Sequence, residues 1–222
     1  MNEAPSASPT AEEAAFFRAR GFLTLPGLIR PGEIAELAEA FDAAVTQATG
    51  RGPQDAGAFG DEPPALVTVV SPEARIPSLG ASRLASQARR VMAVLFEVPE
   101  ERLLCGWRCF LKPSGAGETP WHQDAAYRPP PHRGGTIWLP LDPATLESGC
   151  LDYLPGSHRG PLLPHALRGH HYVAEPCDGD AAVSCPLSLG DASVHTCLTV
   201  HRAGPNRTAR PRRAFAVVCQ VA

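Results

Sequence analysis

Apolar residues recur every third or fourth position in two stretches of the sequence, residues 31–49 and 82–96, which is the pattern of a helix with one buried face. We also expect a short helix over residues 11–20, closed by Gly21, and a brief strand over residues 22–25. The apolar positions are Ile34, Leu37, Phe41 and Val45 in the first long helix and Leu84, Ala88, Val91 and Leu95 in the second.

After residue 98 the pattern changes to short β-type runs that turn residues separate. Helices followed by seven or eight antiparallel strands predict a mainly β fold with flanking α-helices, in the form of a double-sheet jelly roll that the two long helices cover on one face. The glycine- and proline-rich segment 50–64 is expected to be a long loop that could act as a flap. The predicted strands are residues 103–111, 121–125, 136–141, 150–154, 183–189, 192–201 and 213–221.

The length of 222 residues fits one domain with a substantial core. Residues 1–10 are a polar tail that we expect to be disordered, so the domain is predicted to span residues 11–222. Glycine and proline number 20 and 24, which agrees with a turn-rich protein. The sequence leaves monomer and dimer equally open.

The net charge of −3 and the pI of about 6.2 argue against a nucleic-acid partner, because no overall positive field attracts a polyanion. The amino-terminal residues resemble neither a secretory signal nor a membrane span, so we expect a cytoplasmic protein without a membrane partner. The seven cysteines are odd in number and include no C-x-x-C pair. This argues against a disulfide framework and a zinc site, and we expect most of these thiols to be reduced.

His122 and Asp124 are two residues apart in the predicted strand 121–125, so their side chains are expected on one face, where both could bind one metal ion. Gln123 would point the other way. One such pair is weak evidence, because a surface histidine hydrogen-bonded to a neighbouring carboxylate would give the same pattern.

A remote histidine strengthens the metal hypothesis. His195 and His201 share one face of the predicted strand 192–201. Together with the first pair, His201 would complete a set of two histidines and one carboxylate, which suits Fe(II) and leaves three coordination positions open. The alternative for His201 is a buried histidine that a backbone carbonyl satisfies. An arginine from the basic segment 207–213 could then hold a dicarboxylate, or the whole segment could be a solvated turn.

Four runs in order along the chain resemble the phytanoyl-CoA dioxygenase family of Fe(II)/2-oxoglutarate-dependent oxygenases, and the likeness covers roughly 200 residues from near Gly21. It implies a double-stranded β-helix, a cupin-like jelly roll, with Fe(II), 2-oxoglutarate and O2 as cofactor and co-substrates. It also implies that His122, Asp124 and His201 are the metal ligands. Because the carboxylate ligand is present, halogenation is disfavoured. The runs are WHQD (121–124), SGCLDYLPGSH (148–158), GDASVHTCLTVHRAGPN (190–206) and RPRRAF (210–215).

The resemblance also implies a site for 2-oxoglutarate. Arg212, eleven residues after the distal histidine, would bind the far carboxylate, and Trp138 would line the pocket. Lys112 occupies a position that is often basic in the family, with no role that we can assign. Many members have a serine where this chain has Ala203, so a hydroxyl contact to the co-substrate is lost, and Thr136 or another polar group could replace it.

The substrate is less determined by the sequence. His195, Tyr127 and His158 are candidate substrate-binding residues, although His158 could instead fix the turn in which it lies. The basic segments 128–133 and 159–171 could surround the mouth of the pocket and favour an anionic or heavily hydroxylated small molecule, or they could be solvated loops.

A compact chain rich in proline, with a single lysine, resembles the bacterial oxygenases that modify natural products, including oligosaccharide antibiotics. We therefore expect hydroxylation or oxidative ring closure of a sugar-containing molecule. A metal-dependent cupin-type isomerase and a non-redox binding jelly roll remain as alternatives, and neither would need a dicarboxylate-binding arginine.

Overall fold

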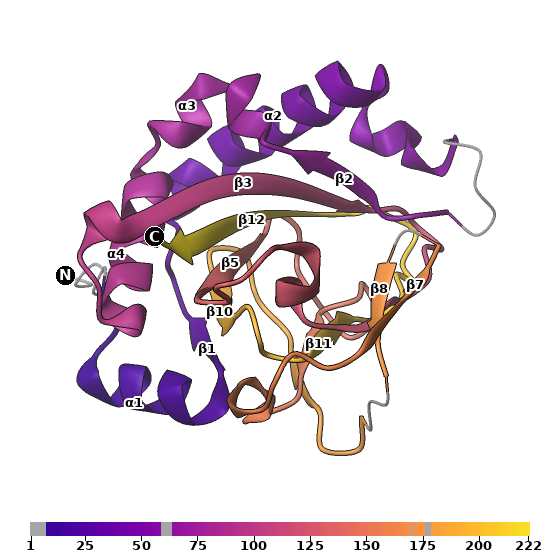
Figure 1. Cartoon of the computed structure of the whole chain (residues 1–222). Helices are drawn as coiled ribbons and strands as arrows, with labels where there is room; N and C mark the ends of the chain where they lie inside the picture. Colours follow the sequence, from indigo (N-terminus) through magenta and orange to yellow (C-terminus); the bar gives the residue numbers. More distant parts are fainter. Residues whose placement is uncertain (1–7, 59–63, 170, 176–178) are drawn as a thin grey trace.

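Antiparallel strands from two sheets surround a shared interior in the structure, a computed structural model that describes residues 8–58, 64–169, 171–175 and 179–222 (Figure 1). The helices are α1 (Ala11–Arg20), α2 (Pro31–Thr49), α3 (Pro77–Gly80) and α4 (Arg83–Phe96). The strands are β1 (Phe22–Leu25), β2 (Val67–Val70), β3 (Leu103–Lys112), β4 (Thr119–His122), β5 (Gly134–Pro140), β6 (Leu151–Tyr153), β7 (His165–Arg168), β8 (His171–Ala174), β9 (Val183–Cys185), β10 (Ala192–Thr196), β11 (His201–Ala203) and β12 (Arg212–Val221).

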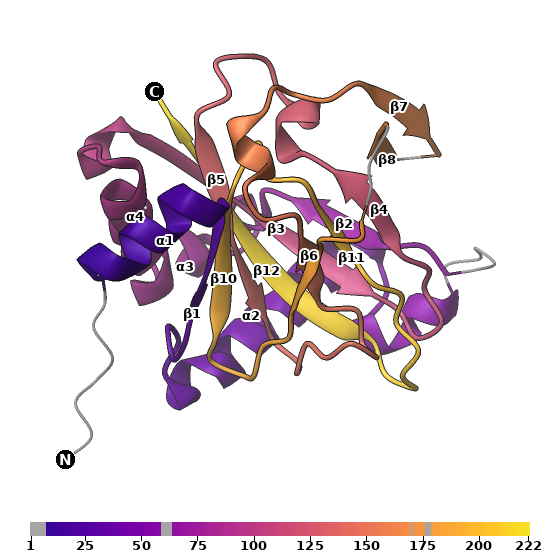
Figure 2. The same cartoon turned by 90° about the horizontal axis from the view of Figure 1, so that it is seen from below.

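Within the described residues, the larger sheet has the strand order β1-β10-β5-β12-β3-β2, and the smaller sheet has the order β4-β11-β6-β9 (Figure 2). The hairpin of β7 and β8 lies beside β4. This arrangement confirms the predicted mainly β fold with flanking helices. The predicted helices 11–20, 31–49 and 82–96 are also confirmed as α1, α2 and α4, since α4 begins at Arg83, directly after its capping residue Ser82.

The larger sheet separates two apolar clusters because alternate residues of each strand point to opposite faces. Odd-numbered residues such as Trp107 and Phe215 pack under the helices, where Phe215 lies 5.2 Å from the rings of both Trp107 and Phe41 of α2. Even-numbered residues such as Trp138 and Ala216 face the smaller sheet. The helices therefore cover the outer face, and the inner face is left to form the site.

Two predicted strands are wrong in a way that matters for the site. The predicted strand 192–201 is two strands, β10 and β11, joined by a turn at residues 197–200 that carries the chain from the larger to the smaller sheet. The predicted strand 121–125 ends at His122, and Asp124 begins the short 3-10 helix η4 (Asp124–Tyr127).

Other predicted strands lie at the expected positions but differ in length from the observed strands. Some elements were not predicted. The predicted strand 183–189 is a strand only over Val183–Cys185, and Leu187 adds an isolated β-bridge to Ala144. β2, α3 and the hairpin of β7 and β8 were missed. The predicted loop 50–64 contains the 3-10 helix η1 (Pro53–Ala58), and its residues 59–63 lie outside the described residues, as do residues 1–7 of the predicted tail.

The turn at residues 197–200 docks on the start of β1. The carbonyl of Gly21 accepts hydrogen bonds from the Thr196 N–H at 3.0 Å and from the Thr199 hydroxyl at 2.7 Å. Gly21 has a φ of 84° and ends α1, and a Cβ at this position would collide with His158 and Thr199. Only glycine allows this close approach.

The cysteine expectation needs one correction. Cys105 and Cys219 are opposite each other in the β3–β12 register and form a disulfide. This pair could not be predicted from the sequence, because its members are 114 residues apart and only the strand register joins them. The other described cysteines are buried thiols, as expected, and Cys177 lies outside the described residues.

No helix in the described part of the chain combines the length and the apolar character that crossing a bilayer requires.

We expect Phe215→Ala to lower the free energy of unfolding by about 3 to 5 kcal/mol, because it removes a fully buried ring between α2 and β3. Urea unfolding followed by circular dichroism measures the change. Leu146→Ala is the control, since this side chain is 63% exposed and should change stability by less than about 0.5 kcal/mol. Equal unfolding midpoints for both variants would contradict this account of the core.

Candidate metal centre and its cavity

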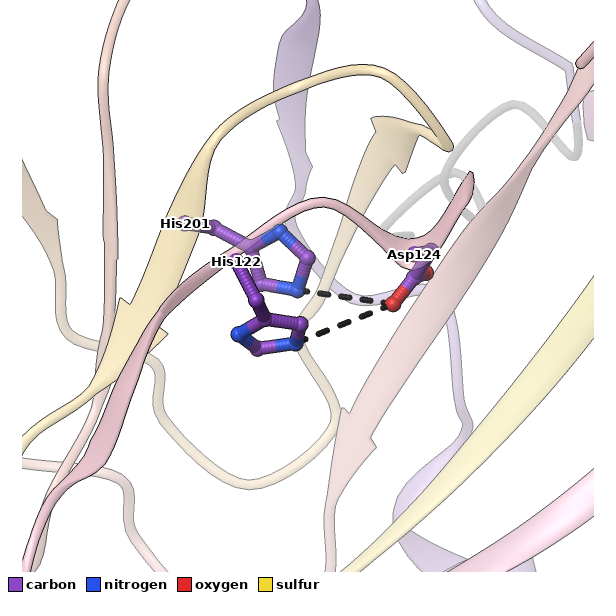
Figure 3. Close-up of side chains that lie close together, drawn as sticks. All are labelled: His122, Asp124 and His201. Carbon is purple, nitrogen blue, oxygen red and sulfur yellow. Dashed lines mark ion pairs between the residues drawn. The ribbon is translucent and has the colours of Figure 1, made fainter. Parts of the chain in front are cut away.

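Three side chains that could bind one metal ion meet at one end of the smaller sheet (Figure 3). His122 ends β4 and His201 begins β11, and the two are directly opposite each other in the register of these strands. Asp124 follows two residues later in η4. Its Oδ1 lies 3.9 Å from Nε2 of His122 and 3.7 Å from Nε2 of His201.

Both histidines present a free lone pair to the centre of this group. Nδ1 of His122 lies 2.8 Å from the carbonyl of Pro120, and Nδ1 of His201 lies 2.9 Å from the carbonyl of Thr199. A carbonyl only accepts, so Nδ1 carries the hydrogen and Nε2 is left as a ligand atom. Burial lowers the pKa of both imidazoles, which keeps them neutral and able to bind a cation.

The second oxygen of Asp124 is held from the larger sheet. Oδ2 accepts a hydrogen bond of 2.6 Å from the Thr136 hydroxyl on β5 and lies 3.3 Å from Nε2 of His195 on β10. Burial alone would raise the pKa of this carboxyl group, but the contact with His195 and the nearby imidazoles hold it well below its ordinary value. The carboxylate is therefore ionised, with Oδ1 directed at the two histidines.

His195, a candidate substrate-binding residue, lines the cavity and is buried beside Asp124. It is 2% exposed, and its Nδ1 is 3.2 Å from the Tyr153 hydroxyl, which is 2.8 Å from the Ser193 hydroxyl. From the sequence we proposed that His195 binds the substrate and that Thr136 contacts the co-substrate. In the structure both side chains contact Asp124. Tyr153 and Ser193 were missed as supporting residues, although Ser193 could have been found from its position two residues before His195 on the same strand.

Arg212 is a buried cation in the same cavity as the candidate ligands. It is 2% exposed, its guanidinium carbon lies 5.0 Å from the Trp138 ring, and its Nε and Nη1 have no hydrogen-bond partner. Burial lowers the pKa of Arg212 to about 10, so it remains charged at neutral pH. A buried charge with unused donors is costly unless an anion binds it, and a carboxylate matches its geometry.

Lys112 has a structural contact that the sequence did not reveal. It is fully buried opposite Arg212 in the β3–β12 register, and its Nζ donates to the carbonyls of Ala203 and Gly204. It is absent from the described residues that line the cavity. Lys112 therefore ties the segment after His201 to the larger sheet.

The cavity has a volume of about 1150 Å³ and extends well beyond the three candidate ligands. Tyr127, Arg128 and His171 line it on the side of η4 and β8, so parts of both predicted basic segments reach it. Tyr127 also packs edge-on against the His122 ring, with centroids 6.0 Å apart. His158 is outside the described lining, and its Nε2 lies 3.1 Å from the carbonyl of Arg18 at the end of α1.

Residues 17–214 match the family described as phytanoyl-CoA dioxygenase (PhyH), which confirms the resemblance read from the motifs. The structure is similar to the crystal structure of EvdO2 from Micromonospora carbonacea var. aurantiaca. The TM-score is 0.87 and the identity 36%, covering 100% of this chain and 94% of that one. EvdO2 complexed with 2-oxoglutarate gives a TM-score of 0.85, again at 36% identity and the same coverage.

A second structural relative is the epimerase SnoN in complex with Fe3+, α-ketoglutarate and nogalamycin RO. Its TM-score is 0.74 and its identity 27%, covering 95% of this chain and 83% of that one. Among curated proteins, phytanoyl-CoA dioxygenase domain-containing protein 1 of Bos taurus is 32% identical over 117 residues, which are 48% of this chain. The match spans 40% of that relative, less than half of its length.

We expect Thr136→Val to weaken the binding of a divalent metal ion by about 10- to 100-fold, because Asp124 loses the hydroxyl that fixes Oδ2. Isothermal titration with Co(II) under anaerobic conditions measures the affinity. Thr68→Val is the matched control, since Thr68 lines the same cavity and is not a hydrogen-bond partner of Asp124. Equal affinities for the two variants would remove the positioning role of Thr136.

Lys112 gives a prediction for pH. Burial, and then the charge of Arg212, lowers the pKa of Lys112 from 10.5 to about 7 in the folded chain. Between these values only the unfolded chain carries the extra proton, so the folded state gains stability as the pH rises from about 7 toward 10.5, and below about 7 this contribution no longer changes with pH. Relative to Lys112→Met, the wild type should gain at most about 1.4 kcal/mol per pH unit from pH 7 to 9 in urea unfolding. A constant difference over this range would contradict the assignment.

Proposed function

The chain belongs to the phytanoyl-CoA dioxygenase (PhyH) family, and we propose that it is an Fe(II)- and 2-oxoglutarate-dependent dioxygenase that oxidises a C–H bond of a small molecule. The observation that carries this proposal is the buried Arg212, which has two donor atoms without a hydrogen-bond partner and lines the cavity that also contains the candidate metal ligands. A metal site alone would not need it. A cupin-type isomerase or a non-redox binding protein has no use for a buried dicarboxylate-binding cation.

His122, Asp124 and His201 would hold the iron. Two neutral imidazoles and one carboxylate suit Fe(II) and leave three positions free for co-substrates. With iron bound at these residues, O2 would supply four oxidising equivalents, of which two convert 2-oxoglutarate to succinate and CO2 and two oxidise the substrate C–H bond. The presence of the Asp124 carboxylate disfavours a halogenase, which needs that position for a halide.

Arg212 would bind the carboxylate of 2-oxoglutarate that is farther from the iron, with Trp138 packed against the guanidinium. Ala203 lacks the hydroxyl that is common in the family, and the Thr136 hydroxyl is already used by Asp124. Thr119 is directly opposite Ala203 in the β4–β11 register and lines the cavity. We therefore assign to Thr119 the hydroxyl contact that Ala203 cannot make.

The substrate is proposed to be a sugar-containing natural product, such as an oligosaccharide antibiotic, oxidised by hydroxylation or ring closure in the cytoplasm. The likeness to SnoN, an epimerase from nogalamycin biosynthesis, supports a natural product. Of the candidate substrate residues, Tyr127 and His195 both line the cavity, and His158 has the structural contact described above. Monomer and dimer both remain compatible with this proposal, and it requires no nucleic-acid or membrane partner.

We expect Arg212→Gln to weaken the binding of 2-oxoglutarate by at least about thirtyfold, because the far carboxylate loses a buried, charged partner. Isothermal titration of the Zn(II)-loaded protein measures the affinity without turnover. Arg210→Gln is the matched control, since Arg210 is exposed and two residues away. Similar affinities for both variants would remove the assignment.

Turnover gives the direct test of the activity. Anaerobically reconstituted protein with Fe(II) and 2-oxoglutarate should form succinate when O2 and a suitable member of a panel of sugar, amino-acid and acyl compounds are added. His122→Ala should abolish this formation. If the wild-type protein does not bind 2-oxoglutarate, the proposed function is wrong.

A further inference from the structure

The cavity continues past the candidate metal centre along the inner face of the larger sheet. Every lining residue that β2 contributes, and all but Leu103 and Cys105 among those from β3 and β12, has an even number, so these side chains share one face of the sheet. We call this part the outer groove. Its residues are Thr68, Val70, Gly106, Arg108, Phe110, Val218 and Gln220.

Strand register places Arg108 in line with the co-substrate site. Arg108 is opposite Val70 on β2 and Ala216 on β12, and Ala216 is opposite Trp138 on β5. Neighbouring strands lie about 4.8 Å apart, so the backbone of Arg108 is about 10 Å from that of Trp138 across the sheet. In this row only Ala216 lies between them, and its side chain is a single methyl group, so it takes up little of the cavity.

The guanidinium of Arg108 has no carboxylate partner. Its Nη1 donates to the carbonyl of Trp107 at 2.8 Å, and among the described residues no carboxylate oxygen lies within 4.0 Å of it. The nearby Glu73 accepts from the Trp107 N–H instead. Arg128 lines the opposite side of the cavity, also without a carboxylate within 4.0 Å, and the acidic lining residue Glu101 is exposed.

We infer that the outer groove binds the substrate, and that Arg108 holds an anionic oxygen group on an elongated molecule that also has an apolar part. A carboxylate, sulfate or phosphate would match the guanidinium. Val70, Phe110 and Val218 supply the apolar walls. The inference rests on the proposed function, because it places the reacting carbon at the candidate metal centre and the anionic group beside Arg108, two strands away from Trp138 in the larger sheet.

The volume agrees with a large substrate. At about 1150 Å³, the cavity exceeds the roughly 300 to 1000 Å³ of typical small-molecule sites. 2-Oxoglutarate has only five carbons and would occupy the part beside Arg212. The remaining space includes the outer groove.

A pair of probes tests the charge requirement directly. 8-Anilinonaphthalene-1-sulfonate has an apolar ring system with one anionic group, and N-phenyl-1-naphthylamine has the same ring system without it. Fluorescence titration of the full chain, loaded with Zn(II) and saturating 2-oxoglutarate, gives both affinities while Arg212 is occupied. Arg108→Gln should weaken the sulfonate about tenfold and change the neutral amine by less than about twofold.

Two further variants locate the probes. Gly106→Leu places a side chain into the outer groove, where a Cβ makes only ordinary contacts, 3.5 Å from Glu73 and 3.8 Å from Arg108. It should weaken both probes. Arg90→Gln removes the same charge from an exposed position outside the cavity lining and should change neither affinity.

The outcomes test anion binding in the outer groove independently of the proposed oxygenase activity. Unchanged sulfonate binding in Arg108→Gln, or equal weakening of both probes, overturns the inference even if 2-oxoglutarate binds as proposed. Weaker binding of the sulfonate probe together with unchanged binding of the neutral amine supports it. Failure of 2-oxoglutarate to bind is measured in a separate titration and counts against the proposed function, while the probe affinities still decide whether Arg108 selects an anion.

Discussion

The carboxylate of Asp124 is held between two sheets, and the rest of the centre depends on that arrangement. Oδ2 is fixed by Thr136 and His195 of the larger sheet, and Oδ1 faces His122 and His201 of the smaller sheet. The position of this one carboxylate therefore depends on the packing of the two sheets against each other. A metal ion bound to Oδ1 would strengthen the same junction, so that metal binding and closure of the sandwich support each other.

Two buried cations lie side by side on β3 and β12, and their different surroundings explain their different roles. Lys112 donates to two backbone carbonyls and is thereby satisfied within the protein. Arg212 retains two buried nitrogen atoms without partners beside the Trp138 ring. Only the arginine is therefore available to a bound anion. A bound carboxylate offsets the energetic cost of burying it, which makes the pocket selective for that chemical group.

Local patterns predicted the helices and most strands, because apolar spacing and turn residues are properties of short segments. The candidate ligands were also found, since four motifs in order resemble the family. The roles of Thr136 and His195 could not be predicted, because their contact with Asp124 depends on the pairing of β5 with β10. The turn that divides the predicted strand 192–201 was missed, since its residues Cys197 to Val200 have no glycine or proline.

Through the close approach at Gly21, the end of the first helix helps to position the candidate metal ligand His201. The Gly21 carbonyl binds the Thr199 hydroxyl, and the Thr199 carbonyl in turn accepts from His201. A protein shortened to begin after β1 would retain all three candidate ligands but lose the support that orients one of them. The boundary of the functional unit is therefore set by this contact rather than by the motifs, and fusions or deletions at the amino terminus act on the chemistry from a distance.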